Sequence, residues 1–151
     1  MKRKIVFLFL IISIVLSLVF SQESEKKPPL NFTIISIKAS NSNKERITKK
    51  VDADIITILQ SLYKFNTYEE ISRRNLKVTE GEKETASLPN SLTFEIEAKT
   101  EENKISAKII IKDKDKEELV NTTIEMQKGK KVILGGWSFN EDTMIIVIKA
   151  S

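Results

Sequence analysis

The sequence predicts an α+β domain in which one amphipathic helix packs on an antiparallel sheet of six to eight strands. Three observations predict it. Apolar residues recur with helical spacing in one segment, residues 47–62. Several later segments alternate apolar and polar residues with the period of two that is typical of half-buried strands. Short polar or Gly-containing turns separate these segments, which favours antiparallel neighbours.

The first twenty-one residues predict export. Residues 2–4 are basic, residues 5–20 carry no charge and are mostly apolar, and the small Val19 and Ser21 precede a cleavage position ahead of Gln22. This arrangement is typical of a secretory signal peptide over residues 1–21. The alternative is an uncleaved anchor, although the run is slightly shorter than the ~18 apolar residues of a membrane span. We therefore expect a periplasmic or extracellular protein, tethered to the membrane only if this segment is retained.

The composition narrows the function classes. The formal charge of +4 includes three basic residues of the predicted signal peptide, so the remainder carries only +1, and no nucleic-acid footprint is expected. The chain contains no Cys, so a hydrophobic core must stabilise it without disulfides. It also contains no His, the usual general base and metal ligand. We therefore expect a protein that is not an enzyme and that needs no cofactor or metal.

The predicted domain starts after a short linker. Residues 22–29 are polar and end in two prolines, which predicts an extended linker between the signal peptide and a single α+β domain over residues 30–151. Residues 32–37 are β-branched and aromatic, which predicts the first strand. The Ser- and Asn-rich residues 39–44 predict a loop.

The predicted helix carries one apolar stripe. Its members are Ile47, Val51, Ile55, Ile58, Leu59 and Leu62. Their spacing follows the 3.6-residue period. Thr48 is the expected N-cap, with an earlier start near Asn43 as the alternative. Asp52 and Asp54 suit the positive end of the helix dipole. Such a stripe must lie on an apolar surface, which the later strands supply.

The clearest predicted hairpin joins residues 92–98 and 105–111 through a turn at residues 100–103. The expected facing pairs are Ala98 with Ile105, Ile96 with Ala107, Phe94 with Ile109, Leu92 with Ile111, and Glu95 with Lys108. This register places the apolar residues on one face, whereas a slip of one residue would expose all of them.

The other strands follow from the same patterns. A second hairpin is predicted from residues 75–78 and 85–88 around a turn at residues 80–83. Further strands are predicted at residues 120–126 and 131–134, with turns at residues 113–118 and 127–130. Residues 144–148 are apolar at every position, which predicts a central strand that is covered on both faces.

Residues 113–117 resemble the opening of a calcium-binding loop. The sixth position, however, is Glu118 where Gly is needed for the sharp turn, and the twelfth is Ile124 where a bidentate Glu is needed. The pattern therefore predicts a solvated turn rather than a metal site.

Two other charged groups are candidate sites. Glu95 and Glu97 share the predicted solvent face of one strand, where burial does not raise a carboxyl pKa for acid-base work, and Lys108 would lower the pKa of Glu95. Arg73 and Arg74 lie near aromatic residues, but neighbouring glutamates prevent the field of one sign that nucleic acid requires. No catalytic, cofactor-binding or metal-ligating residue is therefore assigned.

The sharpest local feature is Gly135-Gly136-Trp137. Two glycines within a strand predict a bulge, a bend or a close backbone approach. Trp137 is the only tryptophan. One interpretation is a bent strand with a tryptophan in the core. The other is a contact surface formed by Gly135, Gly136 and Trp137, because Trp is enriched at interface anchors.

The order of segments from residue 121 to 150 resembles the end of the conserved β-domain of bacterial secretins. The strand at residues 122–126, the turn Lys128-Gly129-Lys130, the apolar residues 132–134 with Gly135-Gly136, and the apolar residues 144–148 carry this resemblance. The chain is much shorter than a secretin and lacks its ring-building domains and its proline-rich segment. The resemblance implies a short stand-alone envelope module that acts by protein contact.

These observations favour an exported, non-enzymatic cell-envelope protein that binds a protein partner or itself. The alternative is a small periplasmic ligand-binding or inhibitor domain with a cavity between helix and sheet. A third hypothesis, an enzyme that uses carboxylates or Lys without His, requires an acid such as Glu95 or Glu97 to be buried in a cleft.

Overall fold

The fold is α+β and mostly β. The computed structural model describes residues 27–41, 47–139 and 141–151. The predicted signal peptide, residues 22–26 of the predicted linker and residues 42–44 of the predicted loop lie outside the described residues. Residues 39 and 40 of that predicted loop belong instead to the strand Leu30–Ser40. Within the described part of the chain, no helix is long and apolar enough to cross a membrane.

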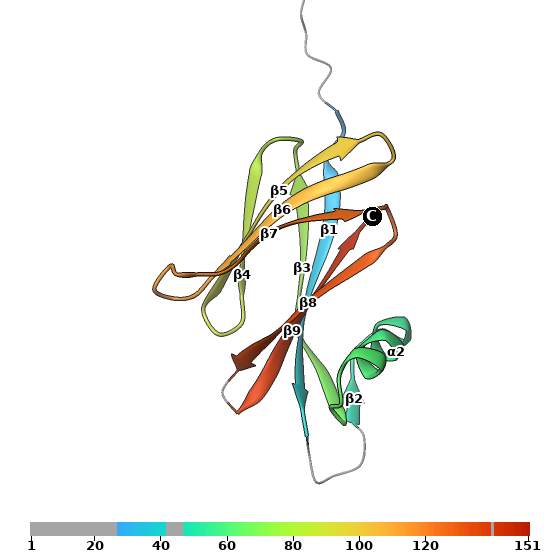
Figure 1. Cartoon of the computed structure of the whole chain (residues 1–151), viewed down its shortest axis with the longest axis vertical. Helices are drawn as coiled ribbons and strands as arrows, with labels where there is room; N and C mark the ends of the chain where they lie inside the picture. Colours follow the sequence, from blue (N-terminus) through green and yellow to red (C-terminus); the bar gives the residue numbers. More distant parts are fainter. Residues whose placement is uncertain (1–26, 42–46, 140) are drawn as a thin grey trace, which may run out of the picture.

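The strands form two sheets (Figure 1). The larger sheet has the order β2-β3-β1-β9-β8, formed by β2 (Ile47–Lys49), β3 (Thr67–Val78), β1 (Leu30–Ser40), β9 (Asp142–Ala150) and β8 (Lys131–Phe139). The smaller sheet has the order β4-β5-β6-β7, formed by β4 (Lys83–Leu88), β5 (Leu92–Glu101), β6 (Lys104–Lys112) and β7 (Glu118–Met126). Neighbouring strands are antiparallel, except that β2 runs parallel to β3.

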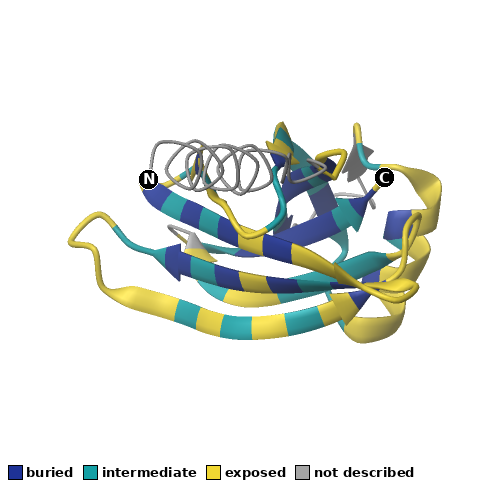
Figure 2. Ribbon diagram, turned by 90° about the horizontal axis from the view of Figure 1, so that it is seen from above, coloured by how far each residue is buried: buried dark blue, intermediate teal, exposed yellow. Residues whose placement is uncertain are grey.

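The prediction of a single sheet is wrong, and the reason lies in the two central strands. β1 and β9 are buried along both faces, and burial alternates along the strands of the smaller sheet (Figure 2). A helix of ten residues covers only part of one face of the larger sheet. The other face requires a second layer, which the half-buried strands of the smaller sheet supply.

Two cores result from this layering. Between the sheets, Phe32, Ile34, Ile146 and Ile148 pack with the inward residues of β5 and β6. On the opposite face of the larger sheet, a second cluster packs against the helix and contains Ile35, Ile37, Ala39, Tyr68, Ile145 and Val147. The prediction that residues 144–148 form a central strand covered on both faces is therefore confirmed, because alternate residues of β9 enter different cores.

The helix α2 (Ala53–Leu62) starts later than predicted. Residues 47–49 form β2 instead of a first helical turn, and Asp52 is the N-cap in place of Thr48. Ile55 and Leu59 are buried against the sheet, but Ile58 and Leu62 are 38% and 60% exposed. Ile58 lies about 60° around the helix from Ile55, whereas Leu62 lies only about 20° from Ile55 but is the last residue of the helix.

The predicted hairpin of β5 and β6 is present with its register displaced by two residues. Ala98 faces Ala107 rather than Ile105, and Lys108 faces Glu97 rather than Glu95. An even displacement keeps every apolar residue on the inner face. The displacement arises because the loop contains only residues 102 and 103, so residues 100 and 101 extend β5.

The second predicted hairpin is wrong. β3 pairs with β1, whereas β4 pairs with β5 in the other sheet. The turn between them carries the chain from one layer to the next, with the amide of Gly81 donating to the carbonyl of Ala98. Both segments alternate as a hairpin would, but their apolar faces meet across the core rather than side by side.

Candidate functional site

The Gly-Gly step lies in β8, the outermost strand of the larger sheet. β8 pairs with β9 on one side, and no described strand pairs with its other side. The register shifts between Gly135 and Trp137, which confirms the predicted bulge. Gly136 is the extra residue and has a φ of 102°, which L-residues with a side chain rarely adopt. The bulge therefore interrupts the edge after Gly135, and pairing with β9 resumes from Trp137 to Phe139.

Other side chains approach the backbone closely at Gly135, which is one of the predicted reasons for a glycine in this strand. A Cβ atom there would lie 2.7 Å from the hydroxyl oxygen of Tyr63 and 3.2 Å from a methyl carbon of Ile145. Tyr63 follows the last residue of α2 and packs against the helix-side core. The glycine thus lets the helix end and the edge strand come together without a collision.

Trp137 is half-buried and packs against the core between the sheets. It also lines a cleft of about 440 Å³ with Leu119 of β7, which is 42% exposed. The other residues of the cleft wall are Asn90, Leu92, Asp113, Lys114 and Ser138. The packing of Trp137 therefore agrees with the interpretation of a bent strand with a tryptophan in the core. The other interpretation, that Trp137 is part of a contact surface, stays a prediction.

Leu119 is a site residue that the alternation pattern did not single out. The apolar residues Val120 and Ile124 pack against the core, and Leu119 precedes them out of phase. An apolar residue that breaks the period of a strand points to the solvent face. That break in the pattern was the signal available in the sequence.

The free edges of the two sheets differ in charge. β2 covers only Thr67, Tyr68 and Glu69 of β3, so the rest of β3 is open on that side. The charged residues along the other open edges are Glu70, Arg73, Arg74 and Lys77 in β3, Lys83 and Glu84 in β4, and Glu118 and Glu125 in β7. In β8, residues 132–139 carry no charge. Charges on an edge oppose pairing with another chain, so β8 is the edge that is least protected by charge.

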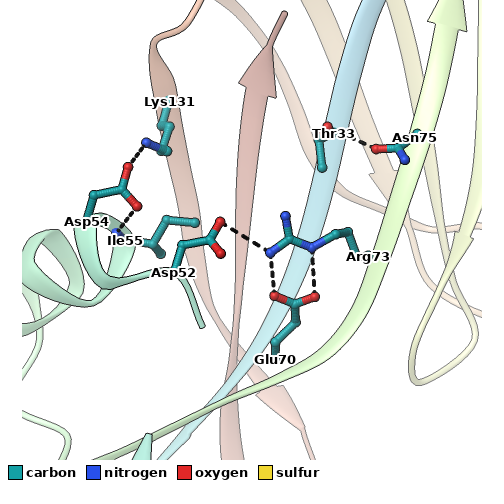
Figure 3. A network of polar contacts seen from close by, with 8 residues as sticks. All are labelled: Thr33, Asp52, Asp54, Ile55, Glu70, Arg73, Asn75 and Lys131. Atoms are coloured by element: carbon teal, nitrogen blue, oxygen red, sulfur yellow. Dashed lines mark hydrogen bonds and ion pairs between the residues drawn. The ribbon is translucent and has the colours of Figure 1, made fainter. Parts of the chain in front are cut away.

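Arg73 and the neighbouring aromatic residues make contacts within the fold. Figure 3 shows the ion pairs of Arg73. The Arg73 guanidinium donates to both carboxylate oxygens of Glu70, at 2.8 and 2.7 Å, and to Asp52 at 3.3 Å. These carboxylates raise the pKa of Arg73 further above its usual range. Tyr63 stacks on Phe65, and the ring of Phe65 meets buried Tyr68 edge to face. This agrees with the predicted mixed-charge face beside packed aromatics.

The start of α2 is tied to β8 by one ion pair. The Lys131 ammonium donates to the carboxylate of Asp54, whose other oxygen accepts from the backbone amide of Ile55 (Figure 3). The bond from Lys131 lowers the pKa of Asp54. Lys131, the one charged residue of β8, is thus held beside the helix.

The predicted acidic pair lies on the outer face of the smaller sheet. Glu95 accepts from Lys112 at 2.7 Å and Lys83 at 3.1 Å, and these bonds lower its pKa. The partner expected from the sequence, Lys108, faces Glu97 instead. In the turn at residues 113–118, Asp113 accepts from the backbone amides of Asp115 and Glu117, as in a solvated turn. Among the described residues, no three acidic side chains gather as a metal site would need.

The space between helix and sheet, where a ligand cavity was the alternative, contains closely packed side chains. Ile35, Ile37, Ile55, Leu59 and Val147 are all buried there. Compared with known proteins, the chain matches no protein family, no curated protein and no solved structure.

Proposed function

We propose that this chain is an exported, non-enzymatic cell-envelope protein that acts by protein contact through the free edge of β8. The observation that carries the proposal is the absence of charge over residues 132–139 of an edge strand, while the other open edges carry charged residues. An uncharged edge offers unpaired backbone amides and carbonyls to an added strand.

The cleft beside Trp137 supplies the second part of this contact surface. Main-chain pairing gives affinity to an added strand, and pockets beside the strand give specificity. Trp137 follows the bulge at Gly136 on β8, and it lines this cleft together with the exposed Leu119 of β7. An apolar side chain of the partner can bury the exposed area of Leu119 there, as anchor residues do at interfaces.

Export and the envelope location rest on the sequence. The signal-peptide pattern of residues 1–21 supports export, and the resemblance of residues 122–148 to the secretin β-domain supports a role in the cell envelope. A chain without His or Cys lacks the usual general base and the most reactive nucleophile, which supports a binding role.

Site-specific photocrosslinking tests the proposal. A photoreactive amino acid replaces Leu119 at the contact surface or, as the matched control, the exposed Thr85 of β4 on the opposite edge of the same sheet. In the cells that produce the protein, we expect one crosslinked product of defined mass from position 119 and none from position 85. Loss of that product in an Ile133→Lys variant would link it to β8. Equal products from both positions, or none from either, would contradict the proposal.

A further inference from the structure

We propose that the strand added to β8 is β8 of a second copy of this chain, in an antiparallel pair about a two-fold axis at Ile133. The inference rests on the proposed function, because it names the partner of the same surface. It extends the larger sheet of one copy directly into that of the other.

The bulge limits the length of this pair. The regular part of β8 runs from Lys131 to Gly135, where each residue has a facing partner in β9. Gly136 then departs from the ladder with its positive φ. At this point the spacing of the backbone groups along the edge is interrupted, and the ladder with β9 resumes only over the three residues 137–139. The segment that can pair with a second copy is therefore residues 131–135.

The faces of the strand restrict the register. Facing residues of an antiparallel pair point to the same side of the sheet. Lys131, Ile133 and Gly135 lie on the helix side, whereas Val132 and Leu134 pack toward the core between the sheets. A two-fold axis in this segment must therefore pass beside Val132, Ile133 or Leu134.

Of these three registers, only the one with the axis at Ile133 pairs apolar residues with apolar residues within the regular segment. An axis at Val132 places Lys131 opposite Ile133, and an axis at Leu134 carries the pairing past the bulge. An axis at Ile133 pairs this residue with its own copy, Val132 with Leu134, and Lys131 with Gly135. Apolar cross-strand pairs are favourable, and this register brings no like charges together.

In this register, the charged side chain of Lys131 lies opposite Gly135 of the second copy, where it finds a polar partner. Gly135 has no side chain, and the hydroxyl oxygen of Tyr63 lies above it, 2.7 Å from the position of a Cβ atom. The ammonium of Lys131 from the second copy meets a phenol oxygen there that can accept a hydrogen bond. Each Lys131 also keeps the carboxylate of Asp54 in its own copy within reach. The one charge of the segment thus has polar partners at both ends of the pair.

A disulfide test is direct because the chain contains no cysteine. Facing residues of an antiparallel pair have Cβ atoms about 4.5–5.5 Å apart, close to the span of a disulfide. The full chain with Ile133→Cys is produced in cells and treated with a mild oxidant. The matched control is Ile110→Cys, since Ile110 is half-buried on β6, an inner strand of the smaller sheet. We expect most of the Ile133→Cys protein to run at twice the monomer mass without reductant, and the control to remain monomeric.

Sedimentation of the unmodified protein gives an independent measurement. We expect twice the monomer mass for the natural chain, and the monomer mass for Ile133→Lys with an unchanged circular dichroism spectrum. If Ile133→Lys does not fold, the cysteine variant decides. A folded Ile133→Cys protein that stays monomeric, or equal linkage at both positions, would overturn the inference. A defined photocrosslink from position 119 to a different protein would overturn it too, while the proposed function would stand.

Discussion

The hydroxyl oxygen of Tyr63 stands 2.7 Å from where a Cβ atom on Gly135 would lie. Gly135→Ala must therefore displace the tyrosine or the edge strand, and we expect the free energy of unfolding to fall by about 1–3 kcal/mol. Tyr63→Phe removes the obstructing oxygen, so the alanine should cost less in that background. Urea denaturation of the four chains of this double-mutant cycle measures the difference. An equal cost in both backgrounds would assign the obstruction to Ile145 instead.

Gly136 is restricted for a different reason. No atom lies within 4 Å of a Cβ built there, but its φ of 102° is unfavourable for alanine. We expect Gly136→Ala to lower the free energy of unfolding by about 1–2 kcal/mol, from backbone strain alone. Tyr63→Phe should give no relief at this position. A urea denaturation curve with an unchanged midpoint would show that the bulge can relax.

The sequence predicts correctly those strands whose burial follows from the local pattern of apolar and polar residues. The alternation of β5 and β6 and the fully apolar Met144 to Ile148 each require one burial pattern, and the structure has it. The pattern cannot tell which apolar faces meet edge to edge and which meet across a core. For that reason β3 and β4, which alternate like a hairpin, belong to different sheets.

The sequence predicts the backbone bulge of the candidate site, but not the strands and side chains that surround it. Two adjacent glycines indicate a bulge from conformational preference alone, and the bulge is present. That β8 is an edge strand depends on the order of all the described strands, which no local pattern contains. Leu119 and Trp137 line one cleft although β7 and β8 belong to different sheets, and that arrangement depends on how the two sheets stack.

Leu59 and Leu62, two apolar residues of α2, differ in burial and therefore in their contribution to stability. Leu59 is fully buried against the larger sheet, whereas Leu62 is 60% exposed one turn further along. We expect Leu59→Ala to lower the free energy of unfolding by about 2–4 kcal/mol and Leu62→Ala by no more than about 0.5 kcal/mol. Thermal or urea unfolding followed by circular dichroism measures both. Similar costs would mean that Leu62 is covered in solution.

The buried Ser36 faces Ser72 across β1 and β3, and neither hydroxyl oxygen has a hydrogen-bond partner among the described residues. A buried polar group without a partner keeps its desolvation cost uncompensated. Ser36→Ala removes one such group, and we expect the free energy of unfolding to rise by about 0.5–1.5 kcal/mol. Urea denaturation checks this. Loss of stability would show instead that the hydroxyl is hydrogen-bonded in solution, for example by a trapped water.

Glu95 lies between two lysines on the outer face of the smaller sheet. Its side chain is 13% exposed, and its carboxylate accepts from Lys112 and Lys83. Glu97 of the same strand is exposed and makes no ion pair with the described residues, so Glu97→Gln removes a charge without removing a pair. This strand therefore contains its own control for the effect of the paired carboxylate.

The paired carboxylate makes stability depend on pH in a predictable direction. The bonds from Lys112 and Lys83 lower the pKa of Glu95 in the folded protein, relative to an ordinary value of 4.5. Because the pKa of Glu95 is lower in the folded protein than in the unfolded chain, its ion pairs stabilise the fold in full at pH values above the unfolded pKa. This stabilisation is lost as the pH falls through the folded pKa.

We expect Glu95→Gln to lower the free energy of unfolding by about 1 kcal/mol at pH 7, since Lys83 is half-exposed. The difference from the natural chain should shrink below about pH 4.5 and vanish in stronger acid. Urea denaturation between pH 3 and about pH 8 measures it for Glu95→Gln and Glu97→Gln together. A cost for Glu95→Gln that does not change with pH would show that the ion pairs do not form in solution.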